Sequence, residues 1–246
     1  MRTMIDDIAG KVALITDATS ATGTALAKHL SGEGVRLALG ARDKTELKVL
    51  ADELVWDGGK VVAMETDMSE SMQAGRLAAA AVEAFGRIDV VINNACPHQS
   101  PALYGDAAAN ARVEADLHML GVVHSILAVV PHVGESRAYI IDVAPFHMSG
   151  GSLTGVIAAG AMRGVLRASR RLRALAAQHG MRMTLIAPSL SGTPRDQNGA
   201  NSAEPMAPHG ITAAAIARAV TFAIVQAGDM QIDEIFFRQP LPHKHQ

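Results

Sequence analysis

Short apolar runs alternate with longer amphipathic stretches along this chain, and this alternation restricts the folds that it can form. Uninterrupted apolar runs are typical of strands in a parallel sheet, because helices cover both faces of such a sheet. Apolar residues at helical spacing fill the stretches between the runs. The sequence therefore predicts an α/β fold, a single doubly wound domain over residues 1–246 with a parallel seven-stranded sheet and helices on both faces.

The predicted elements follow this pattern closely. The strands are expected at Val12–Thr16, Arg36–Leu39, Val61–Glu65, Val90–Ile92, Ala138–Val143, Thr184–Ile186 and Glu234–Phe237. The helices are expected at Gly23–Gly32, Lys44–Asp57, Ser69–Phe85, Asn110–Pro131, Ile157–His179 and Thr212–Ala227. Residues 189–210 are rich in Pro, Gly, Asn and Ser, which predicts a loop or lid within the domain.

The composition excludes several classes of partner. A net charge of -2 gives no reason to expect nucleic acid or an anionic membrane as a partner. The N-terminal residues do not resemble a signal peptide, and His124 and Ser125 interrupt the longest apolar run, so we expect no membrane span. Cys96 is the only cysteine, which excludes an internal disulfide and favours a cytoplasmic location.

Short motifs in a fixed order along the chain resemble the short-chain dehydrogenase/reductase family. They are Gly10–Thr16, Asp67, Phe85–Asp89, Asn93-Asn94-Ala95, Leu120-Gly121-Val122, Ala187-Pro188 and Thr193-Pro194. The ending Ile232–Arg238 is similar to the branch that includes serine and clavaldehyde dehydrogenases. The resemblance implies a Rossmann-like fold, a nicotinamide cofactor, and subunits that associate through two long helices, here Asn110–Pro131 and Ile157–His179.

The phosphate loop departs from the pattern of this family. The family reads Thr-Gly-x-x-x-Gly-x-Gly, but between Thr16 and Gly23 this chain keeps only Gly23, which packs the helix against the strand. Asp17 stands at the first glycine position. A carboxylate about 5 Å from a phosphate charge costs about 3 kcal/mol at an effective dielectric constant of about 20. Alternatively, Asp17 points away or caps the helix, and the loop binds a cofactor with altered geometry.

The expected cofactor is therefore either none or weakly bound NADP(H). After the second predicted strand, Arg42 replaces the acid that would favour NAD(H), and it could meet a 2′-phosphate. Arg42 could equally be a solvated loop arginine. If a cofactor binds, the residues expected to hold it are Gly23, Arg42, Asp67, Asn93 and Thr193.

The catalytic residues that the resemblance implies are missing. The family uses an asparagine, a serine, a tyrosine and a lysine, and counting back from Ala187-Pro188 places these at His118, Pro145, Ala158 and Met162. A shift of three residues chooses Asp142, Gly155 and Ala159 for the last three positions. The chain has no lysine between Lys60 and Lys244, and its only tyrosines are Tyr104 and Tyr139. We therefore expect a degenerate active site without tyrosine-dependent carbonyl reduction.

Some titratable side chains remain near the expected cleft. His118, Asp142 and His147 lie around the carboxyl end of the fifth predicted strand and are the candidate catalytic residues. The alternative is that His118 makes only a local hydrogen bond and Asp142 is a structural acid. No spaced set of metal ligands occurs, so we expect no metal site.

Three functions remain open at this point. The first is a repurposed enzyme that binds a small molecule in the sheet-edge cleft and catalyses an atypical, non-redox step. The second is a catalytically silent subunit, a pseudoenzyme that pairs with an active paralogue. The third is an NADPH-dependent oxidoreductase with a substitute proton relay. The expected assembly is either a homo-oligomer, as a dimer or a tetramer, or a hetero-oligomer with a paralogue. One face of the long helix at Ile157–His179 carries a stripe of four arginines, Arg163, Arg167, Arg170 and Arg171. This stripe is either a solvated or subunit-facing surface or a site for an acidic partner.

Overall fold

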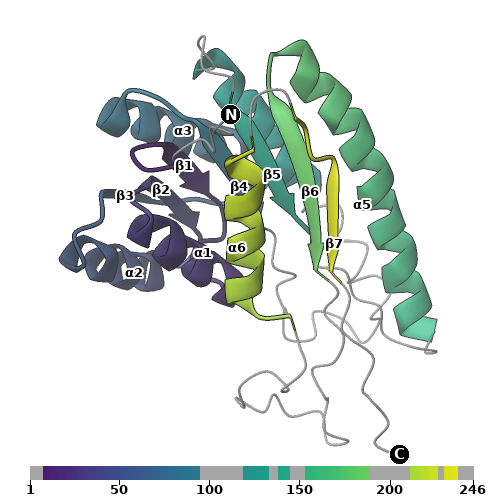
Figure 1. Ribbon diagram of the computed structural model, residues 1–246, viewed down its shortest axis with the longest axis horizontal. Coiled ribbons are helices and arrows are strands. Elements are labelled where there is room, and N and C mark those ends of the chain that lie inside the picture. Colours follow the sequence, from purple (N-terminus) through teal and green to yellow (C-terminus); the bar gives the residue numbers. More distant parts are fainter. Residues whose placement is uncertain are drawn as a thin grey trace, which may run out of the picture.

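The computed structural model describes residues 8–94, 119–132, 138–144, 153–188, 211–226 and 230–237. Seven parallel strands form one sheet in the order β3-β2-β1-β4-β5-β6-β7 (Figure 1). The strands are β1 (Val12–Ile15), β2 (Arg36–Ala41), β3 (Val61–Glu65), β4 (Val90–Asn94), β5 (Tyr139–Val143), β6 (Arg182–Pro188) and β7 (Glu234–Phe237). The predicted parallel seven-stranded sheet is confirmed.

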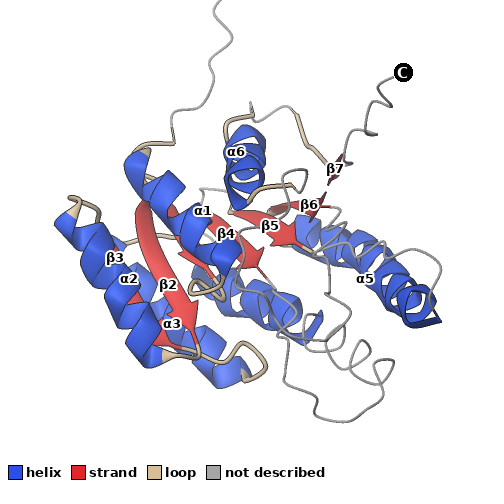
Figure 2. Cartoon of the chain, turned by 90° about the horizontal axis from the view of Figure 1, so that it is seen from below, coloured by secondary structure: helices blue, strands red, loops and turns tan. Residues whose placement is uncertain are grey.

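Helices cover both faces of this sheet, as Figure 2 shows. They are α1 (Ala21–Gly32), α2 (Lys44–Trp56), α3 (Ser71–Phe85), α5 (Leu153–Gln178) and α6 (Ala213–Ile224), together with the helical segment 119–129 and the short 3-10 helix η1 (Val130–His132). Buried residues of α1, α2 and α6 form one core cluster with the sheet, and those of α3, the segment 119–129 and α5 form a second. This is the predicted Rossmann-like arrangement of two helical layers around a sheet.

The helix boundaries follow local capping. Ser20, Asp43 and Thr212 precede α1, α2 and α6, and the side chain of each accepts a hydrogen bond from the first turn of its helix. Such a cap stabilises a helix by about 1 kcal/mol. The prediction that α1 begins at Gly23 is two residues late, because the capping residue is Ser20 and the helix begins at Ala21. The predicted part of the long helix before residue 119 lies outside the described residues, as does the predicted lid at 189–210.

The central strands extend further than their apolar runs. All residues of β1, β4 and β5 are buried, and β4 continues through Asn93 and Asn94. The prediction ended this strand at Ile92, because two successive asparagines are typical of turns rather than strands. The two asparagines therefore lie inside the core, where their amides need hydrogen-bond partners.

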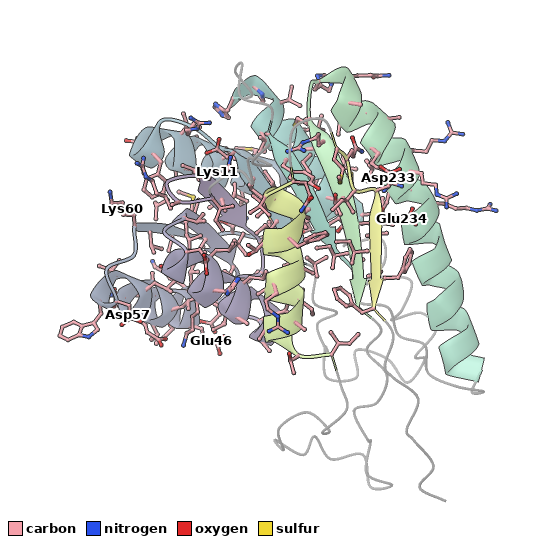
Figure 3. All side chains as sticks on the ribbon, in the orientation of Figure 1. Lys11, Glu46, Asp57, Lys60, Asp233 and Glu234 are labelled. Atoms are coloured by element: carbon pink, nitrogen blue, oxygen red, sulfur yellow. The ribbon has the colours of Figure 1, made fainter. Side chains whose placement is uncertain are left out.

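The segment before β7 is held by side chains of α5 and β6. Arg173 donates to the carbonyl oxygen of Asp233 at 2.5 Å and to Glu234 Oε1 at 3.0 Å. Figure 3 labels the two acceptor residues, Asp233 and Glu234. Arg182 donates to the carbonyl oxygen of Met230 at 3.1 Å, and Thr184 Oγ1 donates to that of Ile232. These bonds fix the last described strand at the edge of the sheet.

Tyr139 begins β5 in a buried polar cluster. Its hydroxyl forms a hydrogen bond with Thr184 Oγ1, and the guanidinium of Arg182 lies over its ring at 4.5 Å from the centroid. Burial raises the pKa of the Tyr139 hydroxyl above its usual value, although the Thr184 hydrogen bond and the charge of Arg182 each lower it. Loss of the hydroxyl proton is therefore less favourable in the folded protein than in the unfolded chain.

This raised pKa predicts a loss of stability in alkali. Above the unfolded value of about 10, the unfolded chain releases the tyrosine proton while the folded protein keeps it. Tyr139 therefore contributes its full stabilisation below about pH 10, and the free energy of unfolding falls as pH rises through the folded pKa. Urea denaturation across this range should show a steeper alkaline decline for the wild type than for Tyr139→Phe. Parallel declines would show that the pKa of Tyr139 is not raised.

Candidate cofactor and active site

Polar groups from three adjacent strands meet at the carboxyl edge of the sheet. The loop after β1 begins at Thr16, β4 ends with Asn93 and Asn94, and β5 carries Asp142 one residue before its end. Strand β4 lies between β1 and β5 and is parallel to both. In doubly wound sheets, ligands bind at the carboxyl edge, so these residues outline the candidate site.

The loop between β1 and α1 is closed on itself through the carbonyl oxygen of Asp17. This oxygen accepts hydrogen bonds from Ser20 N at 3.1 Å, Ser20 Oγ at 2.9 Å and Asn94 Nδ2 at 3.2 Å. Asp17 has a φ of 48°, the only positive value at a non-glycine residue in the described part of the chain. A left-handed backbone costs a non-glycine residue about 1–2 kcal/mol. Asp17 thus keeps the conformation of the missing glycine and adds a carboxylate.

The N-terminus of α1 already has an internal acceptor. Ser20 Oγ accepts a hydrogen bond from Gly23 N at 3.1 Å and another from Asn94 Nδ2 at 2.9 Å. Backbone N–H groups at a helix N-terminus are the donors that bind phosphate in dinucleotide folds. A phosphate would compete with the Ser20 hydroxyl for the Gly23 donor.

The other predicted cofactor residues lie at the same edge with different roles. Arg42 is exposed directly after β2 and is free to reach a ligand, since no ion pair involves it within the described residues. Asp67 Oδ1 accepts from Ser69 N at 2.9 Å and from Ser69 Oγ at 2.7 Å, so its carboxylate stabilises the turn before α3. Thr193 lies outside the described residues.

Asp142 and Asn93 are buried neighbours. They are paired in register across β4 and β5, and 0% and 3% of their surfaces are exposed. Ser169 Oγ of α5 donates to Asp142 Oδ2 at 3.4 Å. Of the three candidate catalytic residues, the structure describes only Asp142, because His118 and His147 lie outside the described residues. Asp142 is a core residue beneath α5 and not a surface acid.

The two asparagines of β4 face opposite sides of the sheet, because successive strand side chains alternate. Asn94 joins the β1–α1 loop through its amide, and its backbone N donates to Thr16 Oγ1 at 3.1 Å. Asn93 follows Val91 on the face covered by α3, the segment 119–129 and α5. Its Oδ1 and Nδ2 have no hydrogen-bond partner within the part of the chain that the structure describes. An unsatisfied buried group of this kind costs about 1–3 kcal/mol.

Sequence reasoning missed Ser20 and Asn94, the two residues that organise the loop. Ser20 precedes the first turn of α1, and a serine at that place is a recognised signal for an N-cap. Asn94 had no such signal, because its contacts join residues 74 and 77 positions apart in the chain. Both alternative registers for the lost tyrosine and lysine fall within α5, at Ala158 and Met162 or at Gly155 and Ala159. Pro145, the first of the two serine positions, lies outside the described residues, and Asp142 is the second.

No group of three or more acidic, histidine or cysteine side chains that could hold a metal occurs within the described residues. None of the helices in this part of the chain is long and apolar enough to cross a membrane.

Gly23 gives a test of how tightly the loop packs on α1. A Cβ atom at this position would lie 2.3 Å from the carbonyl oxygen of Asp17 and 2.8 Å from Ala18 Cα. Because these neighbours are backbone atoms, Gly23→Ala should lower the free energy of unfolding by about 1–3 kcal/mol. The matched control is Gly75→Ala in α3, where a Cβ would meet nothing within 4 Å, and this change should raise stability by about 0.5–1 kcal/mol. Equal effects in urea denaturation would contradict the packing role of Gly23.

Comparisons with known proteins agree with this architecture. Residues 11–204 match the family model described as short chain dehydrogenase. An uncharacterized oxidoreductase of Methylorubrum extorquens is 33% identical over 132 residues, which cover 53% of each chain. An uncharacterized oxidoreductase of Staphylococcus haemolyticus is 24% identical over 94% of this chain and 98% of its own.

Solved structures share the fold at low sequence identity. An alcohol dehydrogenase of Thermococcus sibiricus, complexed with 5-hydroxy-NADP, superposes with a TM-score of 0.76 at 23% identity, over 93% of this chain and 96% of its own. A short chain dehydrogenase/reductase of Burkholderia phymatum, in complex with NAD, gives 0.74 at 23% identity, over 94% and 90%. The chain belongs to the short-chain dehydrogenase/reductase family.

Proposed function

We propose that this family member binds a small molecule at the carboxyl edge of its sheet and catalyses a step without the tyrosine–lysine proton relay. The step is of a non-redox class, such as isomerisation, dehydration or cyclisation. The observation that carries this proposal is the closed loop between β1 and α1. Ser20 Oγ occupies the Gly23 N–H that a dinucleotide phosphate would need, and the Asn94 amide binds Ser20 Oγ and the carbonyl oxygen of Asp17.

The residues at this edge fit a dinucleotide poorly. Asp17 places a carboxylate at the loop, and Ser20 holds the Gly23 donor. The retained Gly23 and the exposed Arg42 favour NADP(H), but they do not replace the missing phosphate cradle. The expected cofactor is therefore none, or NADP(H) bound weakly, and we derive no hydride transfer for this chain.

The chemistry that we propose rests on the remaining titratable groups. A histidine changes its charge near neutral pH and can act as a general acid or base. His118 and His147 flank β5 in the sequence, and Asp142 lies within it. In this proposal the histidines move protons on the ligand, while the carboxyl of Asp142, which Ser169 supports, orients or polarises the site. The degenerate tetrad and the similarity to the serine and clavaldehyde dehydrogenase branch belong to the same proposal.

A second candidate function is that of a catalytically silent subunit. Helix α5 carries no acidic residue, and Arg167, Arg170 and Arg171 are exposed on one face at helical spacing. Arg170 pairs with Glu234 of the same chain at 3.5 Å, while no ion pair joins Arg167 or Arg171 to another described residue. Like charges at this spacing are destabilising, so an acidic surface of another subunit would stabilise this face. This favours a hetero-oligomer with a paralogue over a homo-oligomer built through the same face.

The third candidate is an NADPH-dependent oxidoreductase with a substitute relay. It draws support from relatives named oxidoreductases and from similar structures in complex with NADP or NAD. Cofactor binding by the purified protein separates it from the first two candidates.

Calorimetric titration with NADPH and NADH tests the role of Asp17. We expect weak binding by the wild type, tighter binding by Asp17→Asn and the tightest binding by Asp17→Gly. Asn removes the charge but keeps a side chain that tolerates positive φ, whereas Gly also removes the side chain. Removing a charge interaction of about 1.4 kcal/mol strengthens affinity about tenfold. Tight binding by the wild type, unchanged in both variants, would instead support the oxidoreductase.

Turnover of small hydroxy and carbonyl metabolites, followed by mass spectrometry, tests the catalytic residues. The combined change His118→Ala and Asp142→Asn should lower turnover about 100-fold or more, because it removes one proposed acid–base histidine and the carboxylate that orients or polarises the site. The matched control is His179→Ala in the exposed turn after α5, which should leave turnover unchanged. Full activity in a folded double variant would rule out this assignment.

A further inference from the structure

The unpartnered amide of Asn93 is the most informative group that the fold leaves unexplained. Its residue is 3% exposed, and neither Oδ1 nor Nδ2 has a hydrogen-bond partner among the described residues. Asn94, the next residue, gives an internal comparison, because its Nδ2 donates to Asp17 O and to Ser20 Oγ. The fold therefore satisfies one asparagine of β4 and leaves the other with two donors and an acceptor available.

The position of Asn93 places these donors and acceptor in the candidate site. Asn93 is one residue from the carboxyl end of β4, and its register partner Asp142 is one residue from the same end of β5. Ile140 lies two residues before Asp142 and belongs to the core cluster on the face of α3 and α5. Since strand side chains alternate, Asn93 and Asp142 share that face, opposite the phosphate loop.

We propose that Asn93 is a ligand-binding residue of this site. Its amide bonds a compact neutral group that is both a hydrogen-bond donor and an acceptor, that is, a hydroxyl or a primary carboxamide of the small-molecule substrate. The ligand carbonyl or hydroxyl oxygen accepts from Asn93 Nδ2, and a ligand O–H or N–H donates to Asn93 Oδ1. This inference rests on the proposed small-molecule function and names its substrate class.

The chemistry of the surroundings favours such a group over an ion or a hydrocarbon. Asp142 lies alongside and would repel an anion, while its carboxyl already accepts from Ser169. A purely apolar ligand would leave the Asn93 amide without partners. Within the described residues, Asn94 and not Asn93 contacts the phosphate loop.

Thermal unfolding of the ligand-free protein gives the first test. Asn93→Leu and the smaller Asn93→Ala remove an amide that has no partner, so at least one of them should keep or raise the melting temperature. The matched changes Asn94→Leu and Asn94→Ala remove an amide that bonds two acceptors, and both should lower it. Equal losses at the two positions would show that the Asn93 amide already has a structural partner and would overturn the proposal.

Titration of the side-chain amide signals gives the second test. In the nitrogen-15 spectrum of the full chain, the Asn93 signals are those that disappear in Asn93→Leu. Acetamide and propan-2-ol, which donate and accept, should shift these signals saturably, and acetone, which only accepts, should bind about tenfold more weakly. Signals that no probe shifts, or that acetone shifts equally well, would overturn the proposal. Tight NADPH binding would overturn the proposed function instead. The spectra would still test the role of Asn93, because they measure binding of the small probes at its amide.

Discussion

Burial of the central strands on both faces is the constraint on which the rest of this structure depends. A parallel sheet covered by helices leaves its middle strands without contact with water. Apolar side chains meet this condition without partners, but each polar side chain in these strands must find one inside the protein. The polar residues of β4 and β5 are therefore few, because burial of a polar group without a hydrogen-bond partner lowers the free energy of unfolding. The partners of each polar side chain indicate its role. The Asn94 amide bonds the β1–α1 loop, the Asp142 carboxyl accepts a hydrogen bond from Ser169 of α5, and the Asn93 amide has no partner among the described residues.

The loop between β1 and α1 shows how a cofactor cradle can become a structural element. A dinucleotide loop needs bare backbone donors and little negative charge. Here the serine hydroxyl, the asparagine amide and the carbonyl of Asp17 satisfy one another. The loop has a left-handed residue at Asp17 and packs closely at Gly23, while the Gly23 N–H bonds the Ser20 hydroxyl of the same loop.

The sequence was sufficient for the sheet and the layers, because burial on both faces leaves a one-dimensional pattern of apolar runs. The limits of β3 and β7 are as predicted, Val61–Glu65 and Glu234–Phe237. The ends of β4 were harder, since Asn93 and Asn94 have low strand propensity and only tertiary contacts keep them extended. The site was less predictable for the same reason: Ser20 and Asn94 become partners only when β4 is placed beside β1.

The segment before β7 is attached in an unusual way that bears on how the molecule assembles. Carbonyl oxygens of Met230, Ile232 and Asp233 each accept a hydrogen bond from a side chain of α5 or β6. Because Arg173 belongs to α5 and Arg182 and Thr184 belong to β6, the position of β7 depends on these two elements and not only on the ladder between β6 and β7. Thr184 carries this attachment into the interior of the sheet, since its hydroxyl also forms a hydrogen bond with Tyr139 at the start of β5.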